Sequence, residues 1–311
     1  MRYNLWALPP RRTRTPEAPT VRLALSRVRA LAVAITLVLG ACRMALAPAE
    51  REPFFFIQMA DPQFGFFTAN QDFARETANF ERAIAAANRL RPAFVVVCGD
   101  LTHRAGDTAQ VAEYLRIIAQ LDPAIPVYSV PGNHDLALPL SAESMRAYRQ
   151  RFGPDRFTFE SHGLLGIVIN TSLIKEPAVV PDETAAQEAW LRETLAQARS
   201  SGPRQIMVFQ HHSWFLARAD EPDQYFNLPS ARRRDLLDLL ERFGVSHVFA
   251  GHYHRNALGR DGTLEMVTTG PVGKPLGSDP SGFRIVTVRG DSVSHRYYSL
   301  DSLPGQVPLG R

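Results

Sequence analysis

The sequence predicts a layered α/β fold, because strand-like and helix-like segments alternate along most of the chain. Short apolar runs rich in β-branched or aromatic residues have the length of strands, and they lie at 54–60, 93–99, 126–132, 164–170, 205–210 and 245–251. Between these runs, apolar residues recur at helical spacing, at 73–87, 109–120, 183–199 and 230–243. Such alternation is typical of sheets whose faces are covered by helices.

The C-terminal part of the chain follows another pattern. Three strand-like runs, at 264–269, 283–288 and 292–300, follow one another with no helical pattern between them. A succession of strands joined by short connections favours antiparallel pairing, so we expect these runs to close a second sheet. We expect the final residues, 304–311, to form a loose tail.

The composition is that of a globular protein, with 45% hydrophobic and 21% charged residues among 311. This length is enough for one large core or two small ones. The formal net charge is +4, but residues 1–41 carry seven arginines and one glutamate, which leaves 28 basic against 30 acidic residues in the rest of the chain. The excess charge therefore belongs to the N-terminal segment and gives no reason to expect a nucleic-acid partner. The sequence does not predict an oligomeric state.

The N-terminal segment predicts export. Arginines precede an apolar run, Leu31–Ala41, whose 11 residues are followed by Cys42. A bilayer-spanning helix needs ~20 residues, whereas this length suits the apolar region of a secretory signal peptide. The tetrad Leu39–Cys42 resembles a bacterial lipobox, in which the cysteine is acylated. We therefore expect a signal peptide at 1–41 and a lipidated Cys42 that anchors the protein to a bacterial membrane.

Behind this anchor, residues 42–52 read as a short tether to a domain that faces the periplasm or the cell exterior. An ordinary cleaved signal peptide and a plain membrane anchor are the alternatives. A compact leader that begins at Val21 would also place the true start after Met1. The other cysteine, Cys98, then has no partner for a disulfide, and we expect it to be a small buried core residue.

Polar side chains follow five of the strand-like runs, at the point where each run ends. They are Asp61, Gln63, Asp100, Asn133, His134, Asp135, His211, His212, His252 and His254. In an α/β sheet, ligands bind outside the carboxyl ends of the strands, so we expect these distant segments to converge. Carboxylate, imidazole and amide oxygen suit Mn, Fe, Zn or Mg, and no thiolate is present for a structural zinc site. Two metal ions ~3.5–4 Å apart could then act on a phosphoryl group, with Asp100 as the shared ligand.

The order of these motifs along the chain resembles that of a known family. The series is D-x-Q at 61–63, GD at 99–100, GNHD at 132–135, a histidine at 211 and GHxH at 251–254. It resembles the calcineurin-like metallophosphoesterases over about 55–300. The longer stretches ADPQFG, CGDLTH, FQHHSWF and AGHYHRNA resemble the subgroup called calcineurin-like phosphoesterase domain-containing protein 1, which is regarded as containing serine/threonine protein phosphatases.

This resemblance implies a layered metallophosphoesterase sandwich at 53–303, with two packed mixed β-sheets flanked by helices. It also implies two metal ions, the first held by Asp61, Gln63, Asp100 and His254 and the second by Asp100, Asn133, His211 and His252. Most of the family has histidine where this chain has Gln63, although the subgroup itself has glutamine. Because an amide oxygen is a weaker and harder ligand than imidazole, we expect the first metal to bind loosely or to favour Mn or Mg.

The expected function is dinuclear metal-dependent hydrolysis of phosphate esters, above all phosphomonoesters, with phosphoserine and phosphothreonine among them. In this mechanism a metal-bridging hydroxide attacks phosphorus, His134 protonates the leaving group as general acid, and Asp135 orients its ring. A phosphodiesterase or nucleotidase could use the same metal core. A non-catalytic, membrane-tethered binding protein is the third alternative, against which His134 argues, because a scaffold needs no general acid.

Several neighbours of the expected ligands have no assigned role. His212 could support a ligand, touch substrate or simply pack, and contacts to phosphate could also come from His103, Tyr253, Arg255 and Asn256. We expect specificity to reside in the loops at 64–72, 136–142 and 213–228.

Overall fold

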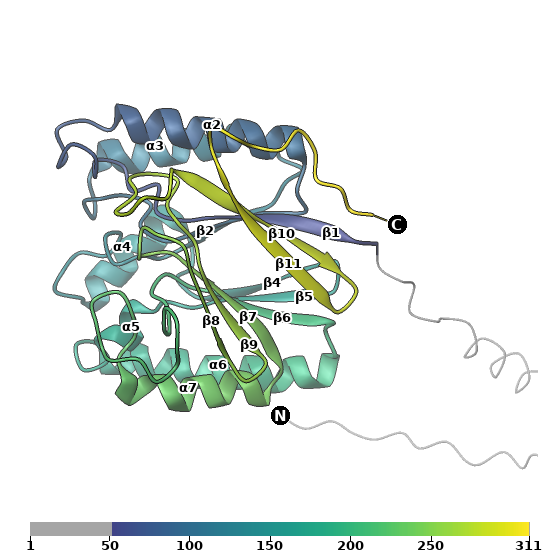
Figure 1. Cartoon of the computed structure of the whole chain (residues 1–311). Coiled ribbons are helices and arrows are strands. Elements are labelled where there is room, and N and C mark those ends of the chain that lie inside the picture. Colours follow the sequence, from purple (N-terminus) through teal and green to yellow (C-terminus); the bar gives the residue numbers. More distant parts are fainter. Residues whose placement is uncertain (1–51, 311) are drawn as a thin grey trace, which may run out of the picture. The chain divides into compact units, whose positions relative to one another are not determined.

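A computed structural model of the chain describes residues 52–310. Two β-sheets pack face to face in this domain, and helices cover the outer side of each sheet (Figure 1). The expected signal peptide, Cys42 and nearly all of the tether lie outside the described residues. Among the described helices, none combines the length and the apolar character that a membrane span requires.

The first sheet is five-stranded, in the order β11-β10-β1-β2-β3. Its strands are β1 (Phe54–Met59), β2 (Val95–Cys98), β3 (Val127–Val130), β10 (Gly282–Arg289) and β11 (Ser292–Ser299). The neighbours β1, β2 and β3 are parallel, whereas β10 is antiparallel to both β1 and β11. The sheet is therefore mixed, as the resemblance to the metallophosphoesterases implies.

The second sheet is six-stranded, in the order β4-β5-β6-β7-β9-β8. Its strands are β4 (Phe157–Ser161), β5 (Leu164–Val168), β6 (Gln205–Phe209), β7 (Val245–Ala250), β8 (Ala257–Asp261) and β9 (Leu264–Thr268). The four central strands are parallel, and β4 and β8 run antiparallel at the two edges.

Six helices connect the strands within the described part of the chain. They are α2 (Ala74–Leu90), α3 (Thr108–Ile118), α4 (Ala142–Phe152), α5 (Ser172–Lys175), α6 (Pro181–Ser201) and α7 (Ser230–Arg242). Local signals place their starts. The side chain of Asp107 accepts from the first turn of α3, Ser141 forms a capping box at the start of α4, and Pro181 occupies the first turn of α6, where its missing N–H costs nothing.

The apolar core has three layers. Between the sheets, the ring of Phe56 lies 5.8 Å from that of Phe209 and 5.6 Å from that of Phe249. Outside the first sheet, Phe80 of α2 stacks on Tyr114 of α3 at 5.6 Å, and α6 and α7 cover the second sheet in the same way (Figure 1). Burial on both faces explains why the strands read as continuous apolar runs. The layered α/β sandwich is therefore confirmed.

One prediction about topology is wrong. The three C-terminal runs do not close one sheet together, because β9 pairs parallel with β7 in the second sheet while β10 and β11 form a hairpin that extends the first sheet beside β1. The reason is that the long connection between β9 and β10 carries the chain from one sheet to the other. Helices α4 and α5 and strands β4 and β8 are further elements that the apolar pattern of the sequence does not predict.

The C-terminal segment is closer to the domain than a loose tail would be. Residues 304–310 contain no helix or strand, but the Arg289 guanidinium donates to the backbone oxygens of Pro308 and Leu309, both at 2.8 Å. The side chains of Val307 and Leu309 pack against the core between the first sheet and its helices. Cys98 is buried, as predicted, with its sulfur 3.8 Å from the backbone oxygen of Phe249.

Candidate metal centre

The predicted site residues meet at one edge of the sandwich. Asp61 follows β1, Asp100 follows β2, Asn133 follows β3, His211 follows β6 and His252 follows β7. These five strands belong to two different sheets, yet their carboxyl ends open toward the same side of the molecule (Figure 1). Ligands bind in that position in open α/β sheets.

The backbone is strained at this edge. Outside glycine, nine described residues have positive φ, and five of them are predicted metal ligands: Asp61, Gln63, Asp100, His252 and His254, with φ between 41° and 67°. A positive φ is uncommon for residues with a side chain, and such strain clusters at functional sites. The concentration at one edge therefore indicates a site rather than scattered turns.

Two glycines allow the ligand segments to approach one another. A Cβ atom on Gly132 would lie 2.0 Å from the backbone nitrogen of Asp100. A Cβ atom on Gly99, whose φ is +81°, would lie 2.4 Å from Nδ1 of His211. Both distances are far shorter than any real contact, so only glycine can bring these segments together.

A first cluster of donor atoms consists of Asp61, Asp100 and His254, whose ligand atoms lie within 4.8 Å of one another. The ring of His254 donates from Nδ1 to the backbone oxygen of Lys274 at 2.6 Å. This bond leaves the lone pair on Nε2, which lies 3.6 Å from Oδ1 of Asp61. The hydrogen bond thus selects the ring atom that faces the cluster.

Gln63 lies next to this first cluster, with its side-chain amide in a defined orientation. Its Nε2 donates to Nδ1 of His103 at 3.3 Å. Its Oε1 is buried and has no hydrogen-bond partner within the described residues. An unpartnered buried carbonyl oxygen is costly, and a cation would satisfy it. The donor set of the first cluster therefore fits a metal ion.

A second cluster surrounds His211. Its Nδ1 donates to the backbone oxygen of Cys98 at 3.0 Å, which leaves Nε2 facing Oδ1 of Asn133 at 2.9 Å and Oδ1 of Asp100 at 3.3 Å. His252 donates from Nε2 to the backbone oxygen of Tyr225 at 3.3 Å, so its Nδ1 is the free ring atom. Between the His211 ring and these oxygens there is a place for a proton on Nε2 or for a cation that replaces it.

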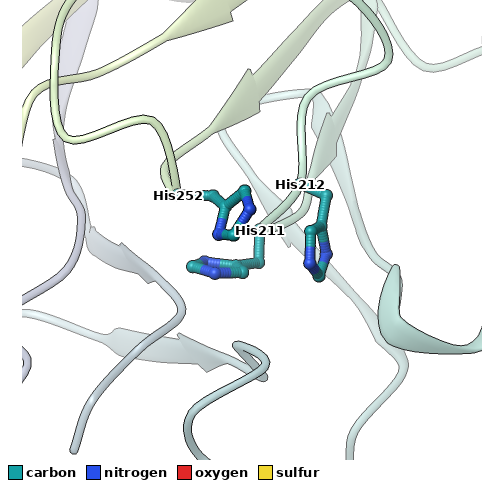
Figure 2. Close-up of side chains that lie close together, drawn as sticks. All are labelled: His211, His212 and His252. Atoms are coloured by element: carbon teal, nitrogen blue, oxygen red, sulfur yellow. The ribbon is translucent and has the colours of Figure 1, made fainter. Parts of the chain in front are cut away.

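His212 belongs to the same group of rings. The ligand atoms of His211, His212 and His252 lie within 4.8 Å of one another. Figure 2 shows His211 and His212 side by side on one segment and His252 on another. The Nδ1 of His212 lies 2.9 Å from the hydroxyl of Thr171. His212 is thus in direct contact with the site, a question that sequence reasoning left open.

Burial shapes the electrostatics of both clusters. Burial and the nearby Asp100 raise the pKa of Asp61 well above its usual range, although His211 acts in the opposite direction. Burial also acts on Asp100, but His211, His134 and His252 outweigh it and hold the pKa of that carboxyl well below its usual range. Two buried carboxylates side by side favour a bound cation.

The pKa values of the three histidines shift in different directions. Burial alone would lower the pKa of His211, but the carboxylates of Asp100 and Asp61 raise it to about 9. Burial lowers the pKa of His252 to about 3, with a contribution from His211, and it lowers the pKa of His254 to about 4. Both are therefore neutral near pH 7, the state in which imidazole binds a metal ion.

Asp135, which the sequence analysis expects to orient the His134 ring, makes its hydrogen bonds to other groups. Its carboxylate accepts from the backbone nitrogen and hydroxyl of Thr102, at 3.0 and 3.2 Å, and from the backbone nitrogen of Gly132 at 2.9 Å. The ring of His134 is held instead by the backbone oxygen of His103, which accepts from Nδ1 at 2.9 Å. Asp135 therefore joins the loops after β2 and β3 and does not orient the His134 ring.

His103 is a site residue that sequence reasoning undervalued. Its backbone oxygen holds the ring of His134, its own ring stacks on that ring at 4.8 Å, and its Nδ1 accepts from Gln63. Its position three residues after Asp100 was the available signal. Arg255 and Asn256 are engaged elsewhere, with Leu276 and Asp279 respectively.

Comparisons with known proteins agree with this geometry. The sequence model of the calcineurin-like phosphoesterase family matches residues 56–256. Human serine/threonine-protein phosphatase CPPED1 is 39% identical over 281 residues, which cover 84% of this chain and 90% of the human protein. The CPPED1 protein of Danio rerio is 37% identical over 81% of this chain and 86% of its own length.

Solved structures share the fold. A dimetal phosphatase from Danio rerio has a TM-score of 0.51 at 17% identity, covering 79% of this chain and 99% of its own. A purple acid phosphatase from yellow lupin seeds has a TM-score of 0.62 at 14% identity, covering 82% of this chain and 52% of its own. The match over 56–256 and the similarity to CPPED1 show that this chain belongs to the calcineurin-like phosphoesterase family, in its CPPED1 subgroup, and that it is a phosphoric ester hydrolase.

Proposed function

We propose that this enzyme hydrolyses phosphomonoesters, with phosphoserine and phosphothreonine side chains of proteins among its substrates, at a pair of metal ions. The name of the human relative, serine/threonine-protein phosphatase, supports this substrate class. The observation that carries the proposal is the pair of donor clusters that meet at Asp100, which contacts His211 of the second cluster and is itself a member of the first.

The residues divide between the two ions in our proposal. The first ion would be held by Asp61, Gln63, Asp100 and His254. The second would be held by Asp100, Asn133, His211 and His252. When bound, the ions supply positive charge to the phosphate oxygens and lower the pKa of water for attack on phosphorus. The donor set suits Mn, Fe, Zn or Mg.

His134 is the proposed general acid. Its backbone nitrogen donates to Oδ1 of Asp100 at 2.9 Å, which places the residue beside both clusters. Its Nδ1 is occupied by the backbone oxygen of His103, so Nε2 is the ring atom that can hold a proton for the leaving oxygen. His103 and Asp135 act as positioning residues, the first on the ring of His134 and the second on the loops around it.

We also propose that the chain is exported and anchored through a lipid on Cys42, as the lipobox-like tetrad Leu39–Cys42 suggests. Mass spectrometry of protein extracted from membranes tests this proposal. A lipid-modified N-terminal Cys42 is the expected species, and stable anchoring then follows from more than one acyl chain. A soluble species that starts after Cys42 would instead indicate an ordinary signal peptide.

The activity is tested with the wild type and Asp100→Asn, each loaded with Mn, Mg, Zn or Fe and assayed on phosphomonoesters, phosphodiesters and phosphopeptides. We expect monoester hydrolysis by the wild type and about two metal ions per chain by elemental analysis. Asp100→Asn should lose both ions because it weakens their common ligand. Loss of a single ion would contradict the shared ligand, and a preference for diesters would contradict the substrate class.

A further inference from the structure

A pocket opens directly beside the second cluster. Asn133 and His212, which belong to the site, form part of its lining, and Leu138, Leu140, Ser172 and Tyr225 form other parts. Three segments far apart in sequence thus meet here: the loop after β3, the start of α5 and the loop between β6 and α7. A group attached to a phosphate bound at the clusters would point into or past this pocket.

The pocket has an unusually exposed apolar wall. Leu138 is 66% exposed and Tyr225 is 61% exposed, and these two are the most exposed of the large hydrophobic side chains among the described residues. Leu140 lies beside them and is buried. Exposed apolar side chains gathered at one place on a soluble protein mark a binding surface. Because Asn133 and His212 of the metal centre line the same pocket, the ligand that this surface suits is part of the substrate.

Ser172 provides a polar anchor within this wall. It is 4% exposed, and its hydroxyl has no hydrogen-bond partner among the described residues. Its backbone nitrogen is already satisfied by Oδ1 of Asn170 at 3.1 Å. A buried hydroxyl without a partner is unfavourable, so a ligand that offers a hydrogen bond here would relieve a cost that the free protein carries.

The charged residues of the pocket argue against a polyanionic ligand. The ammonium of Lys175 donates to the backbone oxygens of Gln224, Tyr225 and Asn227 at 3.1, 2.9 and 2.5 Å. These contacts use all three of its donors. The carboxylate of Glu176 also lines the pocket. A second phosphate group, as in a nucleoside diphosphate, would find no free cation here.

From these contacts we propose that the pocket binds the organic side of a phosphomonoester. It takes an apolar group next to the scissile oxygen, packed on Leu138 and Tyr225, and a hydrogen-bonding group that reaches the hydroxyl of Ser172. The inference deepens the proposed phosphomonoesterase function and rests on it. The apolar group belongs either to a small aromatic ester or to a residue beside a phosphoserine or phosphothreonine in a peptide.

The wall is held in place before substrate arrives. The three bonds from Lys175 fix the backbone of the segment that carries Tyr225. The side chain of Asn227 adds bonds to the Glu221 carboxylate at 2.7 Å and to the backbone oxygen of Pro222 at 3.0 Å. A surface that is already ordered loses little entropy on binding, so its apolar contacts translate into selectivity.

The first test compares 1-naphthyl phosphate with phenyl phosphate, because the two leaving groups have similar acidity and differ mainly in apolar size. We expect the wild type to prefer the naphthyl ester by about 10-fold in kcat/KM, chiefly through KM. Leu138→Ser should bring this ratio close to one. Leu258→Ser is the matched control, since Leu258 is 54% exposed on β8 and does not line the pocket, and it should keep the wild-type ratio.

The second test uses phosphothreonine peptides that carry leucine or serine beside the phosphorylated residue. We expect the leucine peptides to be preferred, with the preference reduced in Leu138→Ser and kept in Leu258→Ser. Ser172→Ala should lower kcat/KM for the leucine peptide relative to that for phenyl phosphate by about 5-fold. Preference in only one of the two series identifies the source of the apolar group and supports the pocket.

Two failures are distinguishable. The proposed role of the pocket is overturned if the wild type hydrolyses the two members of each series with equal kcat/KM. It is also overturned if Leu138→Ser leaves the ratios unchanged. In both cases the phosphomonoesterase function stands. No hydrolysis of any monoester by the metal-loaded enzyme would overturn the proposed function, and this inference with it.

Discussion

The side-chain amide of Gln63 donates from Nε2 to Nδ1 of His103 across 3.3 Å, while its Oε1 is buried without a hydrogen-bond partner among the described residues. The same His103 holds the ring of His134 through its backbone oxygen. A single residue of the loop after β2 therefore orients both a candidate ligand and the candidate general acid.

Two substitutions of Gln63 should change the affinity for the first metal ion in opposite directions. Gln63→His should tighten Zn or Fe, because imidazole is the better donor for these metals. Gln63→Leu should weaken binding at that site by about 10-fold, because it removes the oxygen and keeps the size. Competition titration with a chromogenic chelator measures both affinities. Equal affinities in all three proteins would show that Gln63 does not contact the metal.

Substitution of His134 should separate chemistry from metal binding. His134→Ala should keep both ions, yet lower turnover of alkyl phosphates by ~10²- to 10⁴-fold, because no acid then protonates the leaving alkoxide. The loss should be much smaller for p-nitrophenyl phosphate, whose phenolate leaves without a proton. Parallel assays on the two substrates, with metal content measured on the same samples, test this prediction. Equal losses on both would indicate a role in positioning phosphate.

Removal of the Lys175 ammonium should weaken the binding of the second metal ion. Lys175 holds the backbone oxygen of Tyr225, and the same oxygen accepts from Nε2 of His252. Lys175→Met should therefore loosen the orientation of the His252 ring and reduce affinity for one of the two ions by about 10-fold, the size of effect seen when the partner of a metal ligand is lost. Metal titration by calorimetry measures this change.

Lys274→Met provides the control for Lys175→Met, because it removes the same charge. The ammonium of Lys274 lies over the Phe66 ring at 4.8 Å, and its backbone oxygen, which accepts from His254, stays in place. We expect near-normal affinity for both ions in this variant. A similar loss in both variants would attribute the effect to net charge and not to the Tyr225 segment.

The sequence predicts the parts of this fold that carry a strong apolar pattern. The runs that form β1, β2, β5 and β6 are largely apolar and buried on both faces, so the sequence predicts them as strands. The pattern of helix α4 is weaker, because this helix fully buries only Ser144, Met145 and Tyr148 and most of its other residues are polar. The short edge strand β8 likewise buries only one of its five residues fully. These elements were not predicted because their apolar pattern is weak, and not because it indicates another structure.

In the candidate site, too, the sequence predicts some features and not others. The motifs predict that the ligands lie together at one edge, because each ligand follows a strand and the carboxyl ends of parallel strands meet at the same edge. Hydrogen-bond partners do not follow from motif order. The donors that occupy Asp135 come from Thr102 and Gly132, and the support for His134 comes from the backbone of His103. Such contacts depend on how two loops lie beside each other, which spacing along one chain does not specify.

The ion pairs of Glu183 should make stability depend on pH in a defined direction. Arg149 donates to both oxygens of Glu183, at 3.1 and 2.8 Å, and Arg156 adds a contact at 3.3 Å. The hydrogen bonds from Arg149 lower the pKa of Glu183 from its ordinary value of 4.5. A carboxyl group whose pKa is lower in the folded state stabilises the fold above its unfolded pKa, and this contribution is lost as the pH falls through the folded pKa.

Glu183→Gln should therefore lower the free energy of unfolding by about 1 kcal/mol at pH 7, and the difference from the wild type should shrink as the pH falls below 4.5. Urea unfolding with a chelator present measures both, because the chelator removes any pH dependence of metal binding. Glu160→Gln, which changes an exposed glutamate of β4, should have no comparable effect. A deficit of Glu183→Gln that stays constant or grows toward acid pH would mean that the ion pairs do not stabilise the fold, because protonated glutamate and glutamine carry the same charge.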